Sequence, residues 1–272
     1  MATAVMAILL RVAVFLVLWG VLLAPPAVPL IRKYELAGVL ERPTSRLVLE
    51  GLALVSGILA VATVLWLFDR PSCGTLGFLT GRSLQNALLG LGLGAGMVGL
   101  TLGLLRLFGQ LDLTSGTRLT AQPLLVMITA VLFNAILQQV MVRYFQVTIA
   151  EFTSPRVGLV VSAMVFSVLH LGATRGAPLP SLNLFLAGMV LGYGYLATRD
   201  LWFPIGIHFA WNVLWGPILG LTVSGRSLSS GWQLARVTGS NLLTGGAFGV
   251  EAGLAASIAT CLGLLLLFLR YG

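Results

Sequence analysis

Long runs of apolar residues dominate the chain, and they constrain its fold more than any other feature. Hydrophobic residues make up 58% of the 272 residues and charged residues only 9%, and the mean hydropathy is +1.00. Several runs exceed the roughly 18 apolar residues that span a bilayer as a helix. They lack the alternating pattern of barrel strands, and an open sheet edge cannot be satisfied in lipid. The sequence therefore predicts an all-α fold, a polytopic transmembrane bundle of about eight helices.

The predicted spans follow one another with short loops between them. The spans are Met6–Leu30, Leu47–Phe68, Leu84–Phe108, Pro123–Ala150, Val157–Leu171, Leu182–Ala197, Leu201–Leu221 and Glu251–Leu269, of which the fifth and sixth are short. The first run is longer than the ~7–15-residue core of a signal peptide, so we expect a retained helix that kinks or ends near Pro25 and Pro26. No loop is long enough to bury a core of its own. We expect one integral-membrane domain, 1–272, in which residues 1–120 are scaffold and 121–272 carry the motifs.

Charge and cysteine usage narrow the class further. The net charge of +8 comes from fifteen arginines and one lysine. In a membrane protein, basic residues of the loops set the orientation of the helices and contact lipid headgroups, so the charge does not indicate nucleic-acid binding. The bias toward Arg, Ala, Gly and Leu is typical of a GC-rich bacterial genome and indicates a bacterial cytoplasmic membrane. Cys73 and Cys261 show no CxxC spacing, so we expect neither a disulfide nor a structural metal.

The first three spans carry few polar groups. Two pairs of glycines four residues apart, Gly90 with Gly94 and Gly92 with Gly96, predict close helix packing along the third span. Glu50 lies early in the second span, where we expect it to be solvated near the membrane interface.

Polar side chains enter the predicted spans only after Pro123. Gln139 and Arg143 are four residues apart and share a helix face, while Gln138 is offset by about 100°. His170 follows Phe166 by four residues, and Asn212 follows His208 by four. Polar groups at membrane depth are costly and are usually kept for function.

Each pair also has a structural interpretation. The two glutamines suit an amide clamp between helices, and a single histidine at a helix end is often structural. His208 with Asn212 suits either packing or an oxyanion-binding and water-orienting pair, with Trp211 and Trp215 as an apolar wall. Three such pairs within eighty residues favour the functional interpretation.

The ordered set QQxxxR, FxxxH and HxxxN resembles the EExxxR, FxxxH and HxxxN/D motifs of the CAAX prenyl protease and bacteriocin-processing family. These CPBP, or Abi, proteins are eight-helix intramembrane glutamyl endopeptidases. The resemblance covers the chain from about Thr120 onward and includes the segment from Thr244 to Glu251. It implies catalytic positions at Gln138, Gln139, Arg143, His170, His208 and Asn212, with Phe166 and Trp211 against the substrate. It also implies a metal-independent reaction with no cofactor.

The first motif departs from the family pattern in a way that bears directly on activity. The resemblance implies a glutamate that activates water, a second acid beside it, and an arginine that orients both. A neutral glutamine cannot serve as a general base, although it can hold a water molecule. We therefore predict that the chain hydrolyses peptide bonds poorly or not at all.

Two explanations of the glutamine pair remain open. Either Glu→Gln changes have inactivated an enzyme, or the chain is a natural pseudoprotease that acts as a membrane scaffold, immunity factor or peptide-binding module. The intact remainder of the motifs favours the first. The resemblance predicts a peptide or membrane-protein substrate in either case.

A catalytic zinc is disfavoured, because the chain lacks HExxH and its histidines lie on different helices. A transporter would require repeated halves, which the sequence lacks.

Overall fold

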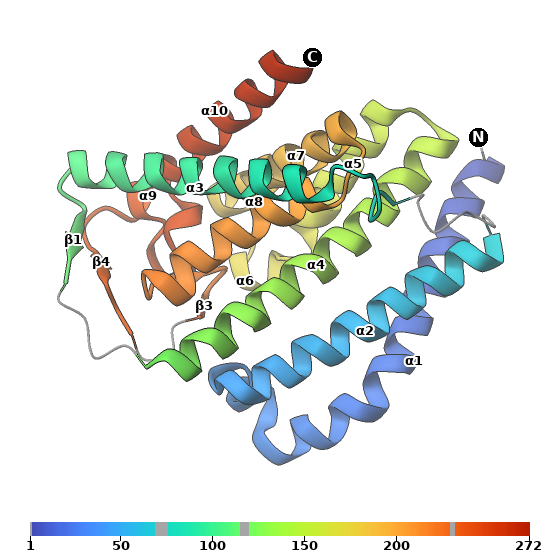
Figure 1. Cartoon of the computed structure of the whole chain (residues 1–272), viewed down its shortest axis with the longest axis horizontal. Helices are drawn as coiled ribbons and strands as arrows, with labels where there is room; N and C mark the ends of the chain where they lie inside the picture. Colours follow the sequence, from blue (N-terminus) through green and yellow to red (C-terminus); the bar gives the residue numbers. More distant parts are fainter. Residues whose placement is uncertain (1, 69–75, 115–119, 229–231) are drawn as a thin grey trace.

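The computed structural model describes residues 2–68, 76–114, 120–228 and 232–272, and it is almost entirely helical (Figure 1). The long helices are α1 (Ala2–Glu41), α2 (Pro43–Phe68), α3 (Ser83–Leu107), α4 (Ala121–Phe152), α7 (Pro178–Thr198) and α10 (Leu254–Tyr271). All six are long and apolar enough to cross a membrane. The shorter α5 (Pro155–Val168) and α8 (Trp202–Val213) complete the set of eight, so the predicted all-α polytopic bundle is confirmed.

The remaining elements are short and lie between the long helices. They are the helices α6 (Leu171–Thr174) and α9 (Asn241–Thr244), the π-helical turn η1 (Leu214–Ile218), and the 3-10 turns η2 (Gly246–Phe248) and η3 (Val250–Ala252). Strand β1 (Leu111–Leu113) pairs antiparallel with β4 (Ala235–Val237), and β2 (Thr222–Val223) pairs antiparallel with β3 (Arg226–Ser227).

Helix α4 lies in the middle of the molecule, with other helices packed on both sides of it. In Figure 1, α1 and α2 lie side by side along one flank, and α4 runs beside α2. On the other side α4 contacts α5 and α8, α8 packs along α3, and α10 packs on α3 and α7. Because α4 has neighbours on most sides, its residues from Gln139 to Gln146 are all buried.

Helix α1 differs from the prediction. It does not end at Pro25 and Pro26 but runs on through both of them and through Pro29. Its helical geometry breaks instead at Glu35, with φ 56° and ψ 159°. Proline removes one backbone donor and crowds the preceding turn, yet helices in apolar surroundings tolerate it where the freed groups find other partners.

Glu50 on α2 also differs from the prediction. The side chain is not solvated: the residue is 8% exposed, and it lies among α2, α4 and the polar end of a cavity described below. Helix α7 begins four residues before the predicted sixth span, because Pro178 takes the first-turn position, where its missing N–H has no partner to lose.

The glycine pairs of α3 divide into two faces. A Cβ at Gly94 would lie 2.6 Å from the carbonyl oxygen of Ile207 on α8, and one at Gly90 would collide with that of Phe203. This pair confirms the predicted close packing of helices. The prediction for Gly92 and Gly96 is wrong, because a Cβ at either would meet nothing within 4 Å. Cys73 lies outside the described residues, and Cys261 is exposed with a free thiol.

Candidate active site

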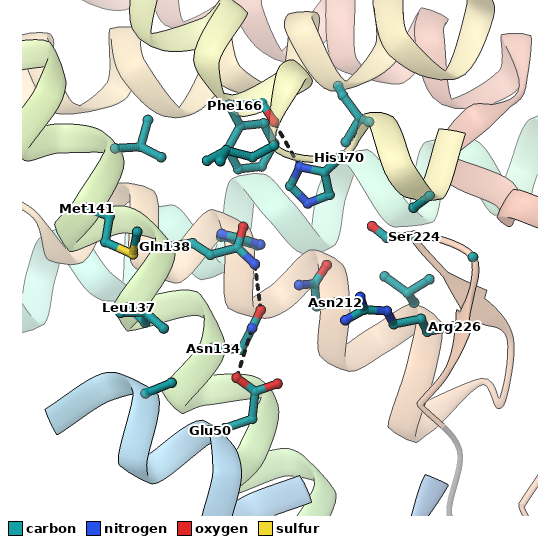
Figure 2. Close-up of a pocket in the computed structure, with 18 of the residues that line it drawn as sticks. Glu50, Asn134, Leu137, Gln138, Met141, Phe166, His170, Asn212, Ser224 and Arg226 are labelled. Atoms are coloured by element: carbon teal, nitrogen blue, oxygen red, sulfur yellow. Dashed lines mark hydrogen bonds between the residues drawn. The ribbon is translucent and has the colours of Figure 1, made fainter. Parts of the chain in front are cut away.

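A cavity of about 1060 Å³ opens at the centre of the bundle and collects most of the predicted polar residues. Its walls come mainly from α1, α2, α4, α7, α8, the end of α5, and the β2–β3 hairpin. The apolar part is lined by α1 residues such as Trp19 and Leu23, and by Leu137 and Met141 of α4. The polar part is shown in Figure 2, where Gln138, His170 and Asn212 face the same space from three different elements.

The two glutamines have different surroundings. Gln138 lines the cavity and is only partly buried, whereas Gln139 is 0% exposed and does not line it. This follows from the helix geometry, since adjacent residues point about 100° apart. The sequence offsets the two positions but leaves their roles open, and in the structure only Gln138 can contact a molecule in the cavity.

Gln138 belongs to a chain of polar contacts that runs across to α2. Its Nε2 donates to Asn134 Oδ1 at 2.8 Å, and Asn134 Nδ2 donates to Glu50 Oε2 at 3.0 Å (Figure 2). Glu50 Oε1 lies 3.8 Å from Arg46 Nε. Because the carboxylate can only accept, Asn134 must turn its oxygen toward Gln138. The Oε1 atom of Gln138 accepts no hydrogen bond from another described residue.

Gln139 is held by the second predicted histidine. Its Nε2 lies 2.8 Å from His208 Nδ1, and both residues are buried. The Oε1 atom of Gln139 has no hydrogen-bond partner among the described residues. The next residue on this helix face, Arg143, is also 0% exposed and bonds to Gln146, while its Nε and Nη2 find no partner in the described part of the chain. Buried unpaired donors of this kind are uncommon and costly.

His170 begins the short helix α6, directly after α5 ends. Helix α5 itself starts where Ser154 accepts a hydrogen bond from Val157 N at 3.3 Å and Pro155 takes the first turn. His170 Nδ1 lies 2.8 Å from the Phe166 carbonyl oxygen, which can only accept, so Nδ1 carries the proton. The neutral imidazole thereby keeps Nε2 free as an acceptor for water or a proton.

Phe166 lies between the two histidines. Its ring centroid is 4.9 Å from that of His170 and 6.0 Å from that of His208, the latter in an edge-to-face arrangement. The predicted FxxxH and HxxxN residues therefore meet, and Phe166 fixes the spacing of the two imidazoles. Asn212, one turn after His208 on α8, lines the cavity and forms no hydrogen bond with another described residue.

Trp211 lines the cavity, and its indole is held in place by contacts with Glu251 and Trp215. Its Nε1 donates to Glu251 Oε2 at 3.1 Å, and its ring packs edge-to-face on Trp215 with centroids 5.9 Å apart. Glu251 belongs to the Thr244–Glu251 segment of the sequence resemblance, and its carboxylate ties this segment to α8. Among the described residues, no three His, Cys, Asp or Glu side chains are grouped to hold a metal ion.

Sequence reasoning missed several residues of the polar cavity wall, among them Asn134, Glu50 and Arg226. Asn134 is four residues before Gln138, and that spacing alone places both on one helix face. Glu50 and Arg226 come from segments far away in the chain, and no local pattern indicates that they reach the same cavity.

The fold and the cavity define the class: an integral membrane protein of helices with a polar site at its centre. Residues 120–214 match the model of the type II CAAX prenyl endopeptidase Rce1-like family. The matched range contains all the predicted site residues, from Gln138 to Asn212, and confirms the resemblance to the CAAX protease family over this segment. No curated protein matches the chain.

Proposed function

We propose that the chain is a CAAX-protease-like membrane endopeptidase scaffold in which Gln138 occupies the water-activating position. One observation carries this proposal: of the two motif glutamines, only Gln138 lines the cavity, opposite His170 and Asn212. A carboxylate there would have access to water and to a bound peptide. The amide can orient water but cannot take its proton, so the chain as it stands binds peptide and hydrolyses it slowly or not at all.

The reaction of a form with glutamate at 138 follows from the surrounding groups. The carboxylate removes a proton from water held between it and His170 Nε2, and the resulting hydroxide attacks the peptide carbonyl. The oxygen of that carbonyl gains negative charge, which the N–H groups of Asn212 and His208 stabilise. The proton passes to the leaving amine, and no acyl-enzyme or metal is needed. Arg143 does not line the cavity, so its role is to position the residues of α4.

A second candidate is a peptide-binding module without catalysis in the same membrane. The observation in its favour is that Gln138 donates to Asn134, which in turn donates to Glu50. The amide therefore has a hydrogen-bonding role of its own in the cavity wall. Such a module would keep the cavity and bind peptides or segments of membrane proteins. We place either protein in a bacterial cytoplasmic membrane, on the composition of the chain.

The two candidates are separated by restoring acids one at a time. Purified protein in detergent is assayed on a panel of quenched-fluorescent peptides as Gln138→Glu, Gln139→Glu and the double variant. We expect hydrolysis with Gln138→Glu but not with Gln139→Glu, because position 139 cannot reach the cavity. The double variant should hydrolyse more weakly than Gln138→Glu, because a carboxylate at 139 draws the proton of His208 to Nδ1 and removes the Nε2 donor. The gain with Gln138→Glu should be on the order of 10²–10⁴-fold, as for a general base. His170→Ala in the Gln138→Glu background should remove it.

Two other results would contradict these expectations. If folded Gln138→Glu and double variants bind peptides from the panel but cleave none, the peptide-binding module is the better description. If Gln139→Glu alone restores cleavage, the assignment of position 138 as the water-activating position is wrong.

A further inference from the structure

A tight hairpin turn places an arginine at the polar end of the cavity. Strands β2 and β3 pair Val223 with Arg226, so Ser224 and Gly225 form a two-residue turn. Both have positive φ, 51° and 74°, which is the geometry of tight hairpin turns. Glycine adopts this conformation freely, whereas a serine there is uncommon and needs support from its surroundings.

That support comes from Glu251. The carboxylate Oε1 accepts from the backbone N of Ser224 at 2.7 Å and from its Oγ at 2.6 Å. Gly225 N donates to the Phe248 carbonyl oxygen at 2.7 Å. Since the other oxygen of Glu251 holds Trp211, one partly buried contact network fixes the hairpin against α8 and the segment before α10.

The side chain of Arg226 is not held by a direct contact with any described residue. Its side chain is exposed and lines the cavity, and it forms no hydrogen bond or ion pair within 4.0 Å with the rest of the described chain. Figure 2 shows its guanidinium extending from the hairpin toward Asn212. The turn, held by Glu251, therefore presents the guanidinium of Arg226 to the part of the cavity where Gln138 and Asn212 lie.

The charges around the cavity favour an anionic ligand group. Among the described residues, the arginines that line it are Arg46, Arg175 and Arg226, and the acids are Glu50 and Glu251. Glu50 interacts with Arg46, and both oxygens of Glu251 are occupied by Ser224 and Trp211. Glu50 also attracts Arg226 electrostatically, although the two side chains are not in direct contact, so three arginines face only two carboxylates along the cavity. A guanidinium pairs with a carboxylate through two parallel N–H donors, which gives direction as well as affinity.

We propose that Arg226 binds a carboxylate of the peptide in this cavity and so positions the peptide backbone beside Gln138 and Asn212. The proposal rests on the proposed function, because it assumes that the cavity takes a peptide. The carboxylate is either the C-terminus of the peptide or the side chain of an acidic residue, and the experiment separates the two.

The test uses the full chain in phosphatidylcholine nanodiscs and measures peptide binding by fluorescence anisotropy. The probes are short fluorescein-labelled peptides of alternating alanine and leucine. One has a free C-terminal carboxylate and one a C-terminal amide. Two further amidated peptides carry a glutamate or a glutamine in place of one leucine. Each is measured with the starting chain, with Arg226→Gln, with Arg175→Gln as a second cavity arginine, and with Arg156→Gln as an exposed arginine away from the cavity.

We expect the starting chain to prefer one of the carboxylate peptides over its neutral counterpart by about tenfold, the effect of one charge-assisted contact. Arg226→Gln should abolish that preference while leaving the affinity for the neutral peptides unchanged. Arg156→Gln should preserve it, and Arg175→Gln should weaken it less than Arg226→Gln. Preference for the free C-terminus or for the glutamate peptide identifies the source of the carboxylate.

Other outcomes overturn the proposal. Binding that ignores the carboxylate, or that falls equally for charged and neutral peptides in Arg226→Gln, contradicts it while leaving the proposed function intact. If Arg226→Gln changes only the response to phosphatidylglycerol added to the nanodiscs, the residue binds lipid instead. If the starting chain binds no peptide of any kind, the proposed function fails, and this assignment fails with it.

Discussion

Gln139 Nε2 lies 2.8 Å from His208 Nδ1, so one buried amide joins α4 to α8. An amide nitrogen can only donate, and Nδ1 of the neutral imidazole must therefore accept, which leaves the proton on Nε2. A carboxylate at position 139 can only accept and would require the proton on Nδ1. The residue at position 139 thus determines whether His208 offers a donor or an acceptor from Nε2.

The first prediction concerns this proton. We expect Gln139→Glu to move the proton of His208 from Nε2 to Nδ1, and ¹⁵N spectra of histidine-labelled protein measure the change directly. The signals of His170 are the internal control, because its Nδ1 faces the Phe166 carbonyl in either form. His170→Ala assigns the two sets of signals. An unchanged pattern for His208 would show that position 139 does not control the imidazole.

Most of the fold could be predicted from the sequence, because membrane helices are recognised by the length and hydropathy of their apolar runs. The eight apolar runs correspond to eight helices, and the spacing of Gln138, Gln139 and Arg143 correctly placed the first on a different face from the other two. The break of α1 was misplaced, since proline at Pro25 and Pro26 is compatible with a helix whose neighbours are apolar.

The rest of the site could not be predicted, because it depends on tertiary packing. Glu50 looks like an interfacial acid in its own helix, and only the approach of α4 gives it Asn134 as a partner. Arg226 is one of several loop arginines in sequence, and only the hairpin and Glu251 bring it to the cavity. Similarly, no sequence signal separates Gly90 and Gly94 from Gly92 and Gly96.

The second prediction concerns Glu50. Glu50→Gln leaves the largely buried Arg46 guanidinium without its nearest carboxylate, and breaking such a pair costs about 3 kcal/mol. We expect a clear fall of the thermal unfolding midpoint in detergent. Asp112→Asn is the control, because Asp112 and Arg106 form an ion pair at 3.9 Å with both side chains about two-thirds exposed, and such pairs contribute little. Equal effects of the two changes would contradict a buried structural role for Glu50.

The third prediction concerns metals. The proposed chemistry requires only a carboxylate, an imidazole and water, so hydrolysis by Gln138→Glu should be unaffected by 1,10-phenanthroline and by EDTA. Activity is measured before and after prolonged dialysis against each chelator, and again after zinc is added back. A loss of activity on dialysis that zinc restores would point to a metal and would replace the general-base mechanism.

The fourth prediction uses the two faces of α3 as a matched pair. Alanine at Gly90 or Gly94 would drive a methyl group into the backbone of α8, at Phe203 and Ile207, and would force the two helices apart. Alanine at Gly92 or Gly96 meets nothing within 4 Å and improves helix propensity by up to about 1 kcal/mol. We therefore expect Gly90→Ala and Gly94→Ala to lower the unfolding midpoint and Gly92→Ala and Gly96→Ala to leave it equal or higher.

Because α8 carries His208 and Asn212, Gly90→Ala and Gly94→Ala should also weaken peptide binding, whereas Gly92→Ala and Gly96→Ala should not. A similar loss for all four would mean that α3 does not pack on α8 through this glycine face.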